Sequence, residues 1–300
     1  MDCSALSLPA VSLSGLNRRI FQTSSLSHRV CSVGEEAMSV SIRYFVRNSV
    51  YCLLRVISGS GKRVRVILLY HSVTKGPSFG SYSVPVKSFE AQMAYLSRHF
   101  KIVRLCDLEH YIATDYQDRI ACVTFDDGCF DNYEVALPVL ERFGIKATFF
   151  VVTGLLGGSL ITSYGNVPLM GSNEIRELAS LGHEVGAHSV SHLKLTQVPL
   201  ERARKEIGDS KHFLEDLIGK EVISFAYPKG AWNETLEEEV RQQGFRYAVT
   251  IQEGLVSDHP DWLALPRVWI SPSLSLGGFA AKLSPAVEWY EKLRRLRKRI

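Results

Sequence analysis

The chain has 300 residues, of which 46% are hydrophobic and 22% charged, a composition typical of a globular enzyme with one large domain or two small ones. The net charge of +4 is unevenly distributed, because residues 1–65 carry nine Lys and Arg against three acidic residues and residues 288–300 carry six against two. The intervening segment is therefore acidic and lacks the spread basic charge of a nucleic-acid-binding domain, whereas the basic ends suit an anionic membrane surface or solvated tails.

Residues 1–37 are rich in serine and have no helical or strand periodicity. They contain no apolar run long enough for the core of a signal peptide, so we expect a disordered or mis-assigned N-terminal extension. Six cysteines stand without a CxxC pair or regular spacing, which predicts reduced thiols. Together these features favour a cytoplasmic protein.

The next segment, 38–63, is predicted to contain an amphipathic helix. One face of that helix would carry the apolar residues Ile42, Phe45, Val46, Val50, Leu53, Leu54 and Ile57. The segment is too short and too charged to span a bilayer. It would therefore lie in a membrane interface or cover the bottom of a barrel, and the sequence favours neither.

Short apolar strands then alternate with helices over residues 64–275. Strands are predicted over 64–70, 120–125, 147–152, 184–187, 222–227, 247–251 and 263–270. Helices are predicted over 88–99, 105–113, 131–143, 172–181, 200–218 and 234–243. About seven β/α units with no glycine-rich dinucleotide motif after a strand predict a parallel α/β barrel rather than an open sheet. A basic C-terminal helix is predicted over 276–300.

Two adjacent carboxylates, Asp126 and Asp127, follow the strand predicted over 120–125. Burial of an ionised carboxylate costs several kcal/mol unless it is paired or binds a metal, so packing does not explain them. His188 and His192 follow another apolar stretch, four residues apart. One aspartate and two histidines make a three-ligand metal site with an open position, as in catalytic zinc centres. The second aspartate is then free to act as a base.

Further polar residues are predicted at the same rim, because the carboxyl ends of parallel barrel strands point into one mouth. His71 follows the first strand, Tyr227 and Lys229 end another, and Arg267 lies in a third. A single histidine is more often structural, but the convergence of this set indicates an active site.

These motifs resemble those of a known family. TFDDG at 124–128 together with HSVSH at 188–192 is similar to the pattern of polysaccharide deacetylases, the NodB-homology proteins of carbohydrate esterase family 4. The resemblance covers roughly residues 64–270. FAYPKG at 225–230 and YHSV at 70–73 resemble the branch that includes poly-N-acetylglucosamine deacetylases. The resemblance implies a distorted (β/α)7 barrel of the NodB-homology type.

The resemblance also implies roles for the residues. Asp127, His188 and His192 would hold a divalent metal, with Zn²⁺ preferred over Co²⁺, Mn²⁺, Ni²⁺ or Fe²⁺. Asp126 would be the general base for a water molecule, and the backbone N–H of Lys229 would help to hold the oxyanion. Apart from the resemblance, Tyr227 and Trp232 could stack on sugar faces, although aromatic side chains at a barrel rim more often serve packing.

The chain departs from the commonest family pattern at two positions. Ala226 stands where an arginine is usual, and no histidine follows Arg267, whereas a Leu-His pair is usual near the C-terminus. We therefore hypothesise that His71 is the general acid and that Arg267 orients Asp126.

The leading prediction is metal-dependent removal of N-acetyl groups from an amino sugar in a polysaccharide or a lipid-linked glycan. Removal of a formyl group is a close variant. A cyclic-amide hydrolase on the same fold would not need the intact metal ligands, and an inactive carbohydrate-binding relative would not need Asp126 either. No nucleic-acid partner is expected, and the basic termini predict peripheral contact with a membrane.

Overall fold

The computed structural model describes residues 46–58, 63–76, 80 and 82–297. The extension predicted over 1–37 and the start of the helix predicted from Ile42 lie outside the described residues. The described residues belong to one compact unit, Val46–Ile300.

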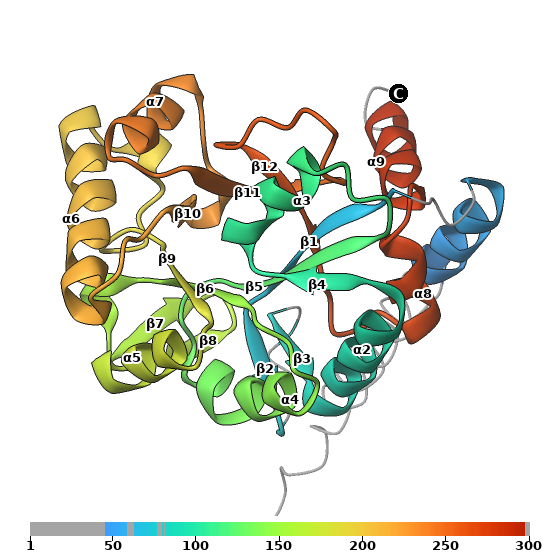
Figure 1. Ribbon diagram of the computed structural model, residues 1–300, viewed down its shortest axis with the longest axis horizontal. Coiled ribbons are helices and arrows are strands. Elements are labelled where there is room, and N and C mark those ends of the chain that lie inside the picture. The colour runs from blue at the N-terminus through green and yellow to red at the C-terminus, as the bar shows by residue number, and fades with distance from the viewer. Residues whose placement is uncertain (1–45, 59–62, 77–79, 81, 298–300) are drawn as a thin grey trace, which may run out of the picture. The chain divides into compact units, whose positions relative to one another are not determined.

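Seven parallel strands form a closed barrel (Figure 1). β1 pairs with β5 from Arg65 opposite Ile120 to Tyr70 opposite Phe125, and this pairing closes the ring. All seven strands lie where the sequence predicts them, so the distorted (β/α)7 barrel is confirmed. In order around the ring they are β1 (Arg65–Tyr70), β12 (Leu265–Trp269), β11 (Tyr247–Glu253), β10 (Ser224–Ala226), β9 (Glu184–Ala187), β6 (Thr148–Val151) and β5 (Ile120–Phe125).

The sequence does not predict the shorter strands of the described chain. β4 (Lys101–Val103) pairs with the first half of β5, outside the ring. β2 (Ser72–Thr74) and β3 (Ser83–Pro85) pair with each other, and β7 (Ser159–Thr162) and β8 (Gly165–Pro168) form an antiparallel hairpin. Each has only three or four residues, too few to establish a strand period in the sequence.

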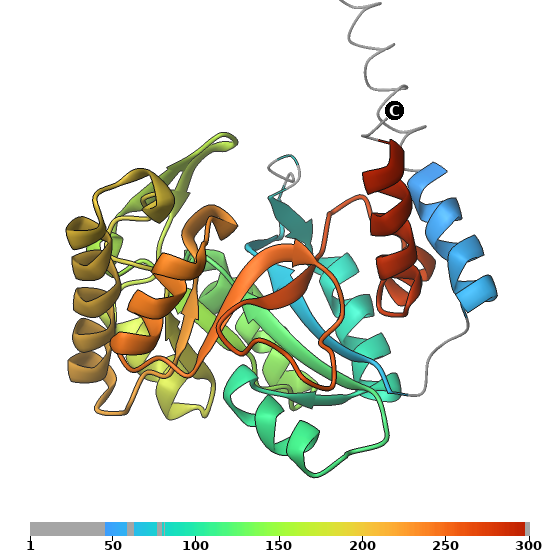
Figure 2. The same ribbon diagram turned by 90° about the horizontal axis from the view of Figure 1, so that it is seen from above.

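Helices surround the barrel close to their predicted positions (Figures 1 and 2). Two begin differently from the prediction: the segment 105–113 starts with a 3₁₀ turn, Leu105–Asp107, and the segment 131–143 starts with a π-helix, Asn132–Ala136. The α-helices of this part of the chain are α2 (Val86–His99), α3 (Leu108–Ala113), α4 (Leu137–Arg142), α5 (Ser172–Ser180), α6 (Leu200–Ile218) and α7 (Glu234–Gln242).

The single C-terminal helix predicted over 276–300 is wrong. The described residues form two helices, α8 (Leu276–Lys282) and α9 (Ala286–Arg297). Pro285 lies between them, and proline disfavours a helical conformation at the residue before it, Ser284. The chain therefore ends one helix and starts another at this point.

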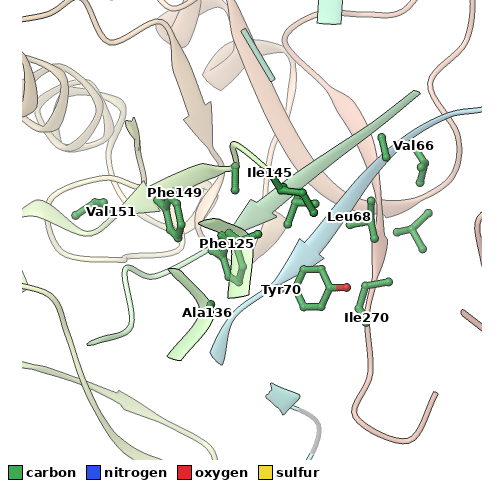
Figure 3. Packing of buried hydrophobic residues seen from close by; sticks show 14 of the residues in the cluster. Val66, Leu68, Tyr70, Phe125, Ala136, Ile145, Phe149, Val151 and Ile270 are labelled. Atoms are coloured by element: carbon green, nitrogen blue, oxygen red, sulfur yellow. The ribbon is translucent and has the colours of Figure 1, made fainter. Parts of the chain in front are cut away.

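Both faces of the barrel strands are buried, which explains why their sequences are continuous apolar runs rather than alternating ones. Val66, Leu68 and Phe125 lie in one buried cluster (Figure 3), which also contains residues of the outer helices. Ile67 and Cys122, from the same two strands, belong to a second buried cluster on the opposite face. Packing on both sides holds the strand ends, and with them the loops that follow, in fixed positions.

The described part of the predicted amphipathic helix is helical over residues 46–58, here called the N-terminal helix. Arg47 donates hydrogen bonds to the hydroxyls of Ser271 and Ser273, at 3.4 and 3.1 Å. Both serines follow the carboxyl end of β12, so the alternative in which this helix covers the bottom of the barrel is wrong. No helix within the described residues is long and apolar enough to cross a bilayer.

Candidate metal centre and catalytic pocket

Loops from several barrel strands converge on one cavity of about 380 Å³ at the carboxyl ends of the strands. The side chains that line it follow β1, β5, β9 and β10 or lie in β11, with the β7–β8 hairpin on one side. They include His71, Tyr82, Asp126, Asp127, His188, His192, Lys229 and Ile251. Active sites of parallel α/β barrels lie at this end, and most of the residues predicted for the rim line this one pocket.

Three side chains in the cavity form a candidate metal site. The Oδ1 atom of Asp127 lies 3.3 Å from the Nε2 atoms of both His188 and His192, and one ligand atom from each residue lies within 4.8 Å of the others. This Oδ1 is buried and has no hydrogen-bond partner. A buried carboxylate oxygen that faces two imidazoles needs a cation, so the donor set fits a divalent metal.

Contacts behind the ligands support the same interpretation. His188 Nδ1 lies 2.7 Å from the carbonyl oxygen of Ala226, which can only accept, so Nδ1 carries a hydrogen and Nε2 is the nitrogen that faces Asp127 and the candidate metal site. Burial, together with the positive charge of His188, lowers the pKa of His192 to about 4. His192 is therefore a neutral imidazole near pH 7, the form that binds metals.

The pKa of His188 is raised instead. Burial alone would lower it, but the nearby carboxylates of Asp127 and Asp126 favour the protonated imidazole and outweigh that effect. The two carboxylates thus favour a positive charge in the cavity. A metal ion can supply that charge in place of a proton.

Asp126 is held by Arg267. The two terminal nitrogens of Arg267 donate to Oδ1 and Oδ2 of Asp126 at 2.7 and 2.6 Å, and Arg267 Nε donates to the carbonyl of Thr250 at 2.8 Å. Burial alone would raise the pKa of Asp126, but the charge and hydrogen bonds of Arg267 hold it below its usual value. Arg267 therefore lies where the hypothesis requires it and keeps Asp126 ionised.

His71 lines the cavity from the end of β1. Its Nδ1 atom is buried without a hydrogen-bond partner. The carbonyl of His71 accepts a hydrogen bond from Asn132 at 2.7 Å, and the next residue, Ser72, donates to the carboxylate of Asp131. Asp131 and Asn132 thus attach the His71 segment to the start of the π-helix.

Tyr82 is a site residue that the sequence does not reveal. Its hydroxyl donates to Asp127 Oδ2 at 2.5 Å, and its ring lies 4.9 Å from that of His71 between centroids. Tyr82 leaves Oδ1, the oxygen that faces the two histidines, for a metal. It belongs to none of the motifs, and its contact spans 45 residues of sequence.

Two of the predicted sugar contacts are not in the cavity. The side chain of Tyr227 is fully buried and donates its hydroxyl hydrogen to the carbonyl of Leu263 at 3.0 Å. Trp232 packs beside it, with ring centroids 6.4 Å apart, and does not line the cavity. The sugar contact predicted for Tyr227 is therefore wrong, because its side chain is fully buried in the wall, whereas the contact predicted for the partly buried Trp232 stays a prediction. Lys229, between them in sequence, does line the cavity.

Four of the five non-glycine residues with positive φ in the described chain lie at this site: Asp127, Ser189, His192 and Lys229. This left-handed backbone is uncommon for residues with a Cβ atom and gathers at functional sites. Glu206 of α6 stabilises this backbone in the loop between His188 and His192. Its buried carboxylate accepts hydrogen bonds from the N–H groups of Val190 and Ser191 at 3.0 and 2.7 Å.

The sequence matches a family model described as polysaccharide deacetylase over residues 113–248. YxkH of Bacillus subtilis, whose name places it among the polysaccharide deacetylases, is 31% identical over 218 residues, which cover 72% of this chain and 74% of YxkH. The poly-beta-1,6-N-acetyl-D-glucosamine N-deacetylase of Staphylococcus epidermidis is 28% identical over 202 residues, which cover 64% of this chain and 69% of that protein.

Solved structures agree with the barrel. IcaB of Ammonifex degensii superposes with a TM-score of 0.63 at 26% identity and covers 74% of this chain and 97% of its own. The deacetylase PplD of Streptococcus pyogenes, solved with acetate, superposes with a TM-score of 0.66 at 24% identity and covers 75% of this chain and all of its own. At 24% identity, the similarity to PplD shows the fold alone.

Proposed function

This chain belongs to the polysaccharide deacetylase family, and on that premise we propose that it removes N-acetyl groups from an amino sugar within a glycan, with a divalent metal as cofactor. Membership makes it a hydrolase of carbon–nitrogen bonds other than peptide bonds. The observation that carries the proposal is the buried Asp127 Oδ1, unpartnered and 3.3 Å from two imidazole nitrogens, beside the Asp126–Arg267 pair.

Asp127, His188 and His192 would hold the metal, and Zn²⁺ suits two imidazoles and one carboxylate. A bound divalent ion polarises a carbonyl and lowers the pKa of a water molecule. Asp126, kept ionised by Arg267, accepts a proton from the attacking water. The backbone N–H of Lys229, in the turn Pro228–Gly230, would help to hold the oxyanion, and His71 would donate a proton to the departing amine.

A polymer that contains N-acetylglucosamine is the substrate class we favour. The Staphylococcus epidermidis relative is named for such a polymer, and the two chains share 28% identity over 202 residues. A lipid-linked glycan with the same sugar carries the same acetamide, and a formamide would need less space. The intact metal ligands and Asp126 favour an active enzyme over a carbohydrate-binding relative.

The test measures metal content and acetate release from β-1,6-linked N-acetylglucosamine oligosaccharides, with formate release assayed in parallel on N-formylated analogues. Chelation should abolish acetate release, and Zn²⁺ should restore it. His192→Ala should lose both metal and activity, whereas His212→Ala, an exposed histidine on α6, should lose neither. Full turnover after chelation, or release of formate alone, would overturn the proposal.

The acid role of His71 has its own test. His71→Ala should slow amide hydrolysis by roughly 10²–10⁴-fold with normal metal content, because the amine leaves only when it is protonated. Hydrolysis of 4-nitrophenyl acetate should change little, because its phenolate needs no proton to leave. Equal losses on both substrates would instead assign His71 a structural role.

The compartment is a separate proposal. The four described cysteines, Cys52, Cys106, Cys122 and Cys129, are free thiols. Thiols persist in reducing compartments, and on that ground we propose the cytoplasm. Localisation of the full chain in fractionated cells of its source tests this, and recovery outside the cytoplasm and its membranes would contradict it.

A further inference from the structure

The N-terminal helix and α9 form a pair at one end of the molecule (Figures 1 and 2). The rings of Tyr51 and Tyr290 stack between them, with centroids 4.4 Å apart and planes at 30°. Tyr51 and Leu54 are buried, and they define the inner side of the N-terminal helix. On α9, Val287 and Glu291 are buried in the same way.

The outer sides of these two helices are also apolar. Leu53 and Ile57 are 61% and 67% exposed, and on α9 the spacing of Trp289, Leu293 and Leu296 aligns them in one exposed stripe. The exposed apolar side chains of the pair are Val46, Leu53, Val56, Ile57, Trp289, Leu293 and Leu296, here called the outer apolar face. They are seven of the fifteen large hydrophobic side chains exposed in the described chain, so this exposure is concentrated rather than scattered.

Basic residues border the outer apolar face. Lys292, Arg294 and Arg295 are exposed on α9, and the sequence continues with Arg297, Lys298 and Arg299. Of the two acidic residues in α9, Glu291 is buried and paired with Arg294 at 2.8 Å, and Glu288 is exposed one turn before Lys292. This basic border contrasts with the acidic segment 66–287 that forms the barrel.

An apolar helix face with a tryptophan and a basic border matches an anionic lipid surface, where apolar groups enter the interface and cations meet phosphates. A second copy fits less well, because a two-fold contact through this face would bring two basic borders together. We propose that the outer apolar face docks on an anionic lipid bilayer. This inference does not depend on the proposed function.

Docking at this face would put the pocket beside the membrane. A second cavity of about 720 Å³ adjoins the metal pocket and shares His71, Lys229 and Ile251 with it. Its other wall comes from the same two helices, including Arg47 and Arg294. A glycan attached to a lipid, or a chain leaving the bilayer, would therefore reach the pocket along the helices that bind the membrane.

The test is cosedimentation of the full chain with vesicles of phosphatidylcholine and phosphatidylglycerol, compared with vesicles of phosphatidylcholine alone. The protein should bind the anionic vesicles, and more weakly at high salt. The double variant Leu53→Glu/Ile57→Glu should bind roughly tenfold or more weakly, because two apolar groups no longer enter the interface. Lys292→Glu/Arg295→Glu should remove most of the salt dependence.

The control is Leu200→Glu/Phe213→Glu, which places the same charges on two exposed apolar positions of α6, across the barrel. It should bind like the unaltered chain. Thermal unfolding and hydrolysis of 4-nitrophenyl acetate confirm that each variant is folded. Failure of the unaltered chain to bind anionic vesicles, or equal binding by Leu53→Glu/Ile57→Glu, would overturn the proposal. So would a dimer that does not bind vesicles and that these substitutions convert to a monomer.

Discussion

Asp126 and Asp127 are adjacent in sequence, yet their carboxylates make different contacts. A left-handed backbone at Asp127, with φ of 72°, separates the two directions. Asp126 points to Arg267, and Asp127 points to His188 and His192. The left-handed backbone of Asp127 thus directs the proposed metal ligand and the proposed base, Asp126, to different partners.

Tyr82 provides the first prediction at this scale. Burial raises the pKa of Tyr82, so its hydroxyl stays protonated and donates to Asp127. Tyr82→Phe removes that hydrogen bond and should weaken zinc binding by about 10–100-fold, as loss of contacts behind metal ligands does. Competition with a fluorescent chelator measures the affinity. Tyr133→Phe, which removes an exposed hydroxyl bonded to Glu177, is the control, and equal affinities in both variants would rule out the role of Tyr82.

Asp131 provides a prediction about pH. Burial raises its pKa to about 6, against the opposing effect of hydrogen bonds from Ser72 and Val73. Between about pH 4 and pH 6, Asp131 is protonated in the folded state but ionised in the unfolded state. The free energy of unfolding therefore falls as pH rises through this window, and the contribution of Asp131 is constant above it. Relative to Asp131→Asn, the free energy of unfolding of the unaltered chain should fall by up to about 2–3 kcal/mol across the window. Urea unfolding at several pH values measures this, with exposed Asp216→Asn as the control. A difference that is constant with pH would contradict the assignment.

At the scale of elements, the site depends on how each strand ends. β9 ends in a loop that Glu206 of α6 holds through backbone N–H groups, and β10 ends in the turn Pro228–Gly230. The motifs predict which strands carry polar residues, but the turn decides that Lys229 faces the cavity while Tyr227 faces the core. Likewise, the π-helix after β5 lets Asn132 reach the carbonyl of His71, a contact that periodicity does not predict.

The turn after β10 can be tested directly. Gly230 has φ of 63°, and a Cβ atom there would lie 2.2 Å from Cγ1 of Ile251. Gly230→Ala should therefore displace the turn, cost about 1–3 kcal/mol of stability and lower kcat by roughly tenfold or more, with metal content unchanged. Gly254→Ala, whose Cβ would lie 3.4 Å from Pro266, is the matched control. Unchanged kcat in Gly230→Ala would show that the turn does not act on the reaction.

At the scale of the whole molecule, the candidate metal site joins distant parts of the barrel. Asp127 follows β5 and the two histidines follow β9, with β6 between these strands in the ring. A ligand that binds only the folded barrel stabilises it by mass action, by about 2.7 kcal/mol when the free metal is 100-fold above its Kd. The melting temperature should therefore rise with added Zn²⁺ and fall with chelator. His192→Ala should abolish this response, and an equal rise in that variant would place the metal elsewhere.

The sequence alone predicts the seven barrel strands, because they are short apolar runs. It also predicts the family and the candidate site residues Asp126, Asp127, His188 and His192, because these lie in motifs a few residues long. The role of Tyr82, the bidentate contact of Arg267 with Asp126 and the burial of Tyr227 were decided only by the tertiary structure. These contacts join residues that lie far apart in sequence, such as the 141 positions between Asp126 and Arg267. A pattern read along the chain contains no distance between such residues, since the closed barrel alone brings them together.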